Sequence, residues 1–148
     1  MAERNPYLPY LMRVAKVTEE APAVKTFRLE FMNPEEAANF EFFTGQFGLY
    51  SAFGEGESTF CIASSPTRKG YIECTFRAVG RVTSALATKE EGDIVGFRGP
   101  YGNLFPLDAW RGKNLLFIAG GIALPPLRSV IWNCLDRRAD FENITVLY

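Results

Sequence analysis

The stretch NLLFIAGGIALPP, residues 114–126, decides the fold of the second half of the chain. Residues 114–119 read as a continuous apolar run, which is typical of a parallel strand buried on both faces. Two glycines follow at once, and residues 144–148 form a second apolar strand. Between them, residues 124–138 have the spacing of a helix, with one apolar face made of Leu127, Val130, Ile131 and Leu135. The order strand, helix, strand predicts the first β-α-β unit of a doubly wound α/β domain.

Upstream of this unit the pattern changes to short strands separated by turn residues. Residues 24–31 alternate cleanly between apolar and polar, so one face of that strand is expected to be buried. Only residues 82–89 look helical. Six such strands with hairpin-like spacing predict an antiparallel barrel or sandwich. The predicted strands are 11–17, 24–31, one that starts at 47, 60–63, 71–79 and 94–98.

These two patterns predict two domains, residues 1–106 and residues 107–148. Two parallel strands and one helix do not make a stable open sheet alone. The second domain therefore reads as truncated, and either further sequence or a partner chain is expected to complete its sheet.

Bulk composition excludes several classes of function. The 148 residues carry a net charge of -1, which gives no general attraction to nucleic acid. No apolar run reaches the roughly 20 residues that a membrane helix requires, so membrane insertion is not expected. The polar start, residues 1–6, lacks the apolar stretch of a signal peptide, which predicts a cytoplasmic location.

The cysteine and histidine counts narrow the chemistry further. The chain has no His, and its three cysteines, Cys61, Cys74 and Cys134, are far apart. A disulfide framework, a C-x-x-C metal site and His-based acid–base catalysis are therefore not expected, and no metal ligands are predicted. Any redox chemistry would belong to a bound cofactor.

Four short motifs occur in a fixed order before the β-α-β unit. They are GQF at 45–47, ESTFCIASSP at 57–66, GRVT at 80–83, and GPYG at 99–102 followed by Phe105. In this order they resemble the ferredoxin-NADP⁺ reductase superfamily over residues 10–148. The resemblance implies a six-stranded antiparallel flavin-binding β-barrel followed by the start of a nicotinamide-nucleotide domain.

Within this superfamily, GEGESTFC at 54–61 resembles the flavin subunits of multisubunit complexes. The similar groups are the gamma subunit of sulfhydrogenases, the flavin-binding subunit of anaerobic sulfite reductase, and the electron-transfer subunit of dihydroorotate dehydrogenase. One departure is that Ser58 and Thr59 stand where many relatives carry an Arg that neutralises the flavin phosphates.

The resemblance places an FAD site on two of the motifs. A flavin ring needs a flat apolar wall, which Phe60 can supply, and Cys61 would lie near the reactive N5 atom. A diphosphate needs converging backbone N–H groups, as at a helix start. The alternative interpretation of the first segment is an ordinary buried strand with a core Cys. The alternative interpretation of the second is a plain turn with an N-cap. The predicted FAD residues are Phe60, Cys61, Ile62, Ala63, Gly80, Val82, Thr83 and Ser84.

A second predicted site, for NAD(P), lies at Gly120, Gly121 and Ile122. Relatives have a third Gly where this chain has Ala123, and Pro125 removes one N–H group from the helix start. The alternative is a tight strand–helix turn that binds no ligand.

The resemblance implies an electron-transfer oxidoreductase subunit in which hydride passes between NAD(P)H and bound FAD. Single electrons would then pass to an iron–sulfur protein or subunit of a multisubunit redox complex. The iron–sulfur cluster would lie on that partner or beyond Tyr148. The alternative function is a non-enzymatic docking module, or a flavin-only relay, that has lost nicotinamide binding.

Overall fold

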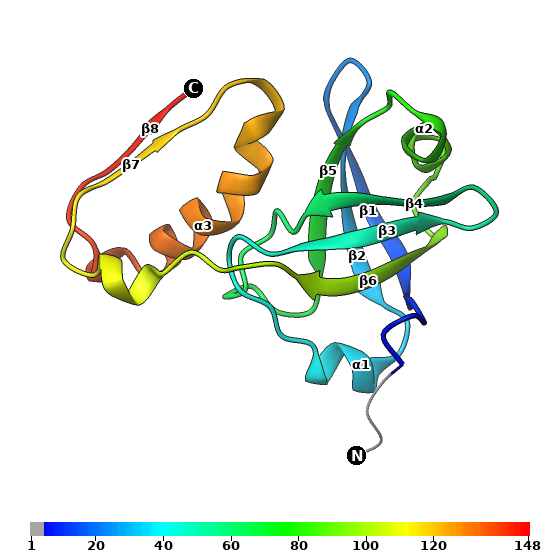
Figure 1. The fold of residues 1–148 in the computed structure, drawn as a ribbon, viewed down its shortest axis with the longest axis horizontal. Coiled ribbons are helices and arrows are strands. Elements are labelled where there is room, and N and C mark those ends of the chain that lie inside the picture. The colour runs from blue at the N-terminus through cyan, green and yellow to red at the C-terminus, as the bar shows by residue number, and fades with distance from the viewer. Residues whose placement is uncertain (1–4) are drawn as a thin grey trace.

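The computed structural model describes residues 5–148 as a six-stranded antiparallel sheet followed by a smaller α/β unit (Figure 1). Residues 1–4, the start of the predicted first domain and of the predicted polar N-terminus, lie outside the described range. The strands of the first unit are β1 (Tyr10–Ala21), β2 (Val24–Phe31), β3 (Phe47–Ala52), β4 (Gly56–Cys61), β5 (Ile72–Arg77) and β6 (Ile94–Tyr101), and its helices are α1 (Pro34–Asn39) and α2 (Arg81–Ala87).

The strand order in the sheet is β4-β3-β6-β1-β2-β5, and every neighbouring pair is antiparallel. The prediction of six antiparallel strands is therefore confirmed. Within residues 5–148 no ladder of hydrogen bonds joins the edge strands β4 and β5. Instead, the N–H of Ala63, just past β4, donates to the carbonyl of Glu73 in β5 at 2.7 Å. The sheet thus curls until its two edges meet through isolated hydrogen bonds.

Aromatic side chains fill the interior of this sheet. Phe27 and Phe76 are almost fully buried and pack edge to face, with ring centroids 5.0 Å apart. Tyr50 and Phe97 lie next to each other in the same core, 5.1 Å apart. Alternate residues of β3 are buried, as the period of a strand requires. Each fully buried phenylalanine side chain contributes about 1.5–3 kcal/mol of hydrophobic stabilisation.

Helix α1 is absent from the sequence-based prediction, which identified only residues 82–89 as helical in this part of the chain. The signals for a helix start were present. The side chain of Asn33 accepts the N–H of Glu35 at 2.9 Å, and Pro34 occupies the first turn. Six residues are too few to show an apolar period, so the pattern alone did not reveal the helix.

The second unit has the predicted strand–helix–strand order. Its elements are η1 (Leu107–Trp110), β7 (Leu115–Ile118), η2 (Gly121–Ala123), α3 (Leu124–Asp136), η3 (Arg138–Asp140) and β8 (Ile144–Leu147). Strands β7 and β8 are parallel, and α3 lies on the side of them that faces the six-stranded sheet (Figure 1). In residues 5–148, α3 is the longest helix and no helix is long and apolar enough to cross a membrane.

Two details of this unit differ from the prediction. Strand β7 is not buried on both faces, because Leu116 is 58% exposed and Ile118 is 68% exposed, while Phe117 is buried against α3. Helix α3 covers only one face of β7 and β8. The second difference is Leu135, which is 43% exposed, whereas the buried residues of α3 are Ser129, Val130, Asn133 and Cys134.

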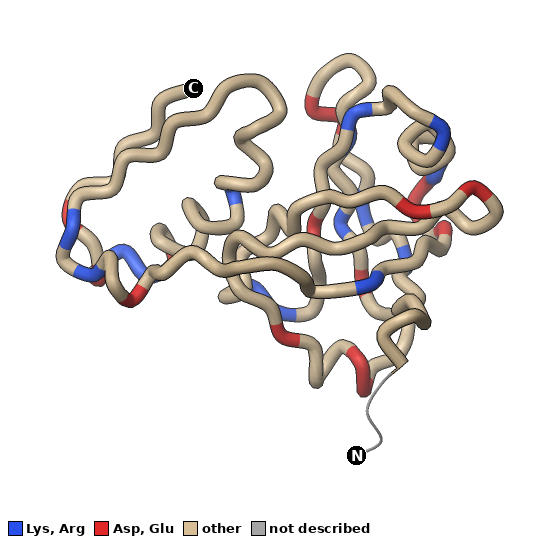
Figure 2. The backbone as a smooth tube through the Cα atoms, viewed as in Figure 1, with Lys and Arg blue, Asp and Glu red and all other residues tan. Residues whose placement is uncertain are grey.

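Charged residues of both signs occur in each unit (Figure 2). Some are paired between strands: Arg13 on β1 pairs with Glu30 on the neighbouring strand β2 at 2.7 Å, and Arg98 on β6 pairs with Glu57 on β4, across β3, at 2.5 Å. Such exposed pairs contribute little to stability individually.

Candidate functional site

The aromatic ring of Phe60 lies near the end of β4, where Gly48 is its partner on β3. Its ring is half-buried, with centroid distances of 5.6 Å to Tyr50 and 5.5 Å to Phe76. Part of the ring is thus backed by the core while part remains accessible. A half-accessible aromatic surface held in this way is what a flat cofactor ring requires.

Cys61 follows Phe60 and is half-buried. Burial raises the pKa of its thiol, so the group is a protonated, weak hydrogen-bond donor at neutral pH. The next two residues, Ile62 and Ala63, are buried, and their N–H groups already donate to the carbonyls of Gln46 at 3.0 Å and Glu73 at 2.7 Å. These two N–H groups are therefore not free for the edge of a ring, and the residues shape the site instead.

The start of α2 is held by the hydroxyl of Thr83. This oxygen accepts the N–H groups of Val79 at 3.0 Å and Gly80 at 2.8 Å, and donates to the carbonyl of Gly80 at 3.0 Å. The N–H of Ser84 donates to the same carbonyl at 2.8 Å. The structure thus shows the cap. Phosphate binding would fall to the backbone N–H groups of the first helical turn, including that of Val82, which have no carbonyl one turn earlier.

Helix α2 lies against the hairpin of β3 and β4, so the two predicted FAD segments are neighbours. A Cβ atom at Gly56 would meet Val82 at 3.5 Å, and Arg81 pairs with Glu55 at 2.5 Å. Phe60 and Val82 also pack on the same hydrophobic core. The two segments therefore belong to the same part of the first unit.

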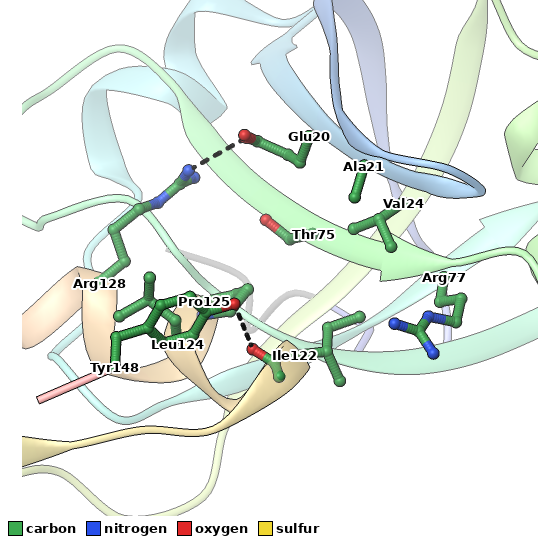
Figure 3. A pocket seen from close by; sticks show the side chains of 11 residues that line it. Glu20, Ala21, Val24, Thr75, Arg77, Ile122, Leu124, Pro125, Arg128 and Tyr148 are labelled. Atoms are coloured by element: carbon green, nitrogen blue, oxygen red, sulfur yellow. Dashed lines mark hydrogen bonds and ion pairs between the residues drawn. The ribbon is translucent and has the colours of Figure 1, made fainter.

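A cleft of about 340 Å³ separates the six-stranded sheet from the turn between β7 and α3 (Figure 3). Gly121 and Ile122 of the predicted NAD(P) site line it, whereas Phe60, Cys61 and Thr83 do not. The hydroxyl of Tyr148 donates to the carbonyl of Gly121 at 3.2 Å. The complete lining consists of Glu20, Ala21, Val24, Thr75, Arg77, Gly121, Ile122, Leu124, Pro125, Arg128 and Tyr148.

The two glycines of this turn differ in what the backbone requires. Gly121 has a φ of +56°, in the left-handed region that favours glycine. Gly120 has a φ of -132°, and a Cβ atom there would meet nothing within 4 Å. A tight turn therefore accounts for Gly121 but not for Gly120, which the fold of residues 5–148 does not need.

Sequence reasoning missed the side chains that join α3 to the six-stranded sheet. Arg68, in the turn before β5, pairs with Asp136 at 3.0 Å and lies over the ring of Trp132 at 4.2 Å. Arg128 pairs with Glu73 at 2.9 Å. The signal was the spacing of four between positions 128, 132 and 136, which puts them on one helix face.

The curled antiparallel sheet, the β-α-β unit and the adjoining β4 and α2 segments define a ferredoxin-reductase-like flavin-binding fold. The family model described as "Oxidoreductase FAD-binding domain" matches residues 12–105. The chain therefore belongs to the oxidoreductase FAD-binding domain family.

Curated relatives agree with this assignment. The chain is 44% identical to sulfhydrogenase 2 subunit gamma of Pyrococcus furiosus over 144 residues, which is 97% of this chain and 49% of the relative. It is 32% identical to a probable dihydroorotate dehydrogenase B electron transfer subunit of Methanocaldococcus jannaschii, over 83% of this chain and 42% of the relative. The chain thus spans about half the length of the curated relatives it matches.

Solved structures share the fold. Phthalate dioxygenase reductase superposes with a TM-score of 0.75 at 19% identity, over 92% of this chain and 42% of that one. The flavohem-like FAD/NAD binding domain of nitric oxide dioxygenase from Vibrio cholerae gives 0.79 at 16% identity, over 95% and 62%. At these identities the likeness concerns the fold alone.

Proposed function

We propose that this chain binds FAD and works as an NAD(P)H-linked electron-transfer subunit of a multisubunit oxidoreductase, with an iron–sulfur protein as its partner. Two curated relatives support this role, a sulfhydrogenase gamma subunit and a probable dihydroorotate dehydrogenase B electron transfer subunit. We place the iron–sulfur cluster on the partner or beyond Tyr148, and the complex in the cytoplasm.

The observation that carries the proposal is the joint placement of Phe60 and α2. The accessible part of the Phe60 ring would hold the flavin ring, with Cys61 beside it. The first turn of α2, around Val82, adjoins β4 and would hold the phosphates through backbone N–H groups. The residues present therefore fit FAD, although Ser58 and Thr59 leave the phosphates without the arginine found in many relatives.

FAD supplies the ability to exchange both hydride and single electrons, which no side chain of this chain provides. The residues of the chain bind the flavin and orient it. Phe60 fixes a plane, the thiol of Cys61 offers a weak donor, and the buried segment at Ile62 and Ala63 excludes water. Their catalytic contribution is positioning, which needs no side-chain acid or base.

For the nicotinamide nucleotide we propose the cleft between the two units. Gly121 and Ile122 line it, and Gly120 has open space beside its Cα atom. Close approach of a dinucleotide to the protein backbone at Gly120 explains a glycine that the fold itself does not require.

The visible spectrum of the purified complete polypeptide tests this function. We expect a yellow protein with flavin absorbance that bleaches when NADH or NADPH is added. Titration with each nucleotide separately identifies the preferred one. A colourless protein that takes up no added FAD would contradict the proposal.

A further inference from the structure

Two consecutive side chains of α3 hold the chain segment that continues β4. The Nε of Arg128 donates to the carbonyl of Ala63 at 3.4 Å, and the hydroxyl of Ser129 donates to the carbonyl of Ser64 at 2.7 Å. Ala63, Ser64 and Ser129 are all buried. The backbone directly after the flavin-binding strand is therefore fixed from the helix.

The guanidinium of Arg128 is in turn held by two carboxylates of the six-stranded sheet. Its Nη2 lies 2.9 Å from Oε2 of Glu73 on β5, and its Nη1 lies 3.6 Å from Oε1 of Glu20 on β1. The Arg128 and Glu73 side chains are 25% and 17% exposed, so water and salt screen this pair less than a surface pair. Glu73 also accepts the N–H of Ala63 through its backbone carbonyl. One side chain thus ties together the ends of three strands.

The same arginine lines the cleft that holds Gly121 and Ile122 (Figure 3). Helix α3 begins at Leu124, directly after the nucleotide-binding turn, and Arg128 stands about one helical turn further on. A single rigid turn of helix therefore connects the proposed nucleotide site to the backbone of the proposed flavin site.

We propose that Arg128 is a positioning residue that sets the flavin strand relative to the nucleotide-binding turn. This inference rests on the proposed function. Glu73, which also pairs with Arg28 at 3.0 Å, and Glu20 together balance the charges of the two arginines, so Arg128 acts by holding Ala63 and β5 in place rather than by binding a phosphate. Loss of its side chain removes the donor to Ala63 and the pairing with Glu73, and leaves the neighbouring bond from Ser129 to Ser64 to hold this segment. Transfer between two bound groups is steeply sensitive to their placement, and a shift of 1 Å costs up to about 100-fold in rate.

The first test compares R128A, R128K and R68A in the complete polypeptide loaded with FAD. Arg68 is the matched control, because it also joins α3 to the segment after β4, through Asp136, yet does not line the cleft. In R128A we expect kcat for flavin reduction by NAD(P)H to fall about 10- to 100-fold. The KM for the nucleotide and the affinity for FAD should stay within about twofold.

In R128K we expect partial recovery, because lysine keeps the charge but not the forked geometry. R68A should leave kcat unchanged. A rise in KM alone in R128A would mark a ligand of the nucleotide, and equal losses in R128A and R68A would mark a general packing role. Either result overturns the inference.

The second test needs neither flavin nor nucleotide. Amide hydrogen exchange on the chain without added ligand should show the N–H of Ala63 exchanging about tenfold faster in R128A than in R68A. Equal exchange in the two variants overturns the inference and leaves the proposed function untouched. If the wild-type chain takes up no FAD, the proposed function fails, while the exchange measurement still decides whether Arg128 holds this strand.

Discussion

The rings of Phe60 and Phe76 lie with their centroids 5.5 Å apart, so a residue of the edge strand β4 rests on a residue of the other edge strand, β5. This contact spans the gap that no ladder of hydrogen bonds bridges in residues 5–148. Phe60 therefore helps to close the sheet, and in the proposed site it would also offer a surface to the flavin ring.

Replacing Phe60 by leucine separates these two roles. Leucine keeps most of the packing volume against Tyr50 and Phe76 but provides no flat surface. Aromatic stacking is worth about 0.5–1.5 kcal/mol, so we expect FAD affinity to fall about 2- to 10-fold. Flavin fluorescence titration measures it. The control is Phe53→Leu, in the turn before β4 and 55% exposed, and equal affinities for the two variants would contradict the site.

Thiol labelling tests the position of Cys61. Cys74 and Cys134 are buried, and burial raises the pKa of Cys134 to about 11. Cys61 is half-buried with a raised pKa, so we expect iodoacetamide to label it first in the native chain, more slowly than a free cysteine. Added FAD should slow this labelling further. Mass spectrometry of the labelled peptides reads out both effects, and a labelling rate indifferent to FAD would argue against Cys61 at the flavin.

Gly120→Ala tests the nucleotide site without disturbing the fold. The backbone at Gly120 suits any residue, and an added Cβ meets no atom within 4 Å. We therefore expect the free energy of unfolding and FAD uptake to change little, within about 0.5 kcal/mol for unfolding. The KM for NAD(P)H should rise, because the methyl group blocks close approach of the dinucleotide. An unchanged KM would count against this glycine as a nucleotide contact.

The contact between Asp136 and Arg68 predicts a pH dependence of stability. Hydrogen bonds from Arg68 and Thr67 lower the pKa of Asp136 in the folded chain. A carboxylate with a lowered pKa stabilises the fold above its unfolded pKa, and this stabilisation is lost as pH falls through the folded value. The difference in unfolding free energy between wild type and Asp136→Asn should therefore shrink below about pH 4. Urea unfolding across that range measures it, and a constant difference would refute the assignment.

Most strands were predictable from the sequence because their signals are local. The alternation in residues 24–31 reflects one buried face, and β2 follows it. Gly54 and Gly102 lie just past β3 and β6, but β6 runs through Gly99 and Pro100 to Tyr101, beyond the predicted end at residue 98. The closure between β4 and β5 was not predictable. It depends on isolated hydrogen bonds, such as that from the N–H of Ala63 to the carbonyl of Glu73, which join segments of different hairpins.

The candidate site was predictable only in part, for a physical reason. Motifs identified Phe60 and Gly120 by residue type and position. They did not show that the hydroxyl of Thr83 is already used to cap α2. Nor did they reveal Arg128 and Ser129, because polar residues on a helix normally face water, and only the docking of α3 on the sheet buries Ser129 and part of Arg128.

When the two units of such a chain are exchanged by gene fusion, the choice of junction decides which unit α3 belongs to. The helix follows residue 107 in sequence, yet Arg128 and Ser129 supply the donors for the buried carbonyls of Ala63 and Ser64. A chimera joined at 106/107 to a foreign partner would orphan both acceptors, at about 1–3 kcal/mol each. A junction placed after Asp136 keeps these donors in the same parent chain as their acceptors, so α3 should be transferred together with the flavin-binding unit.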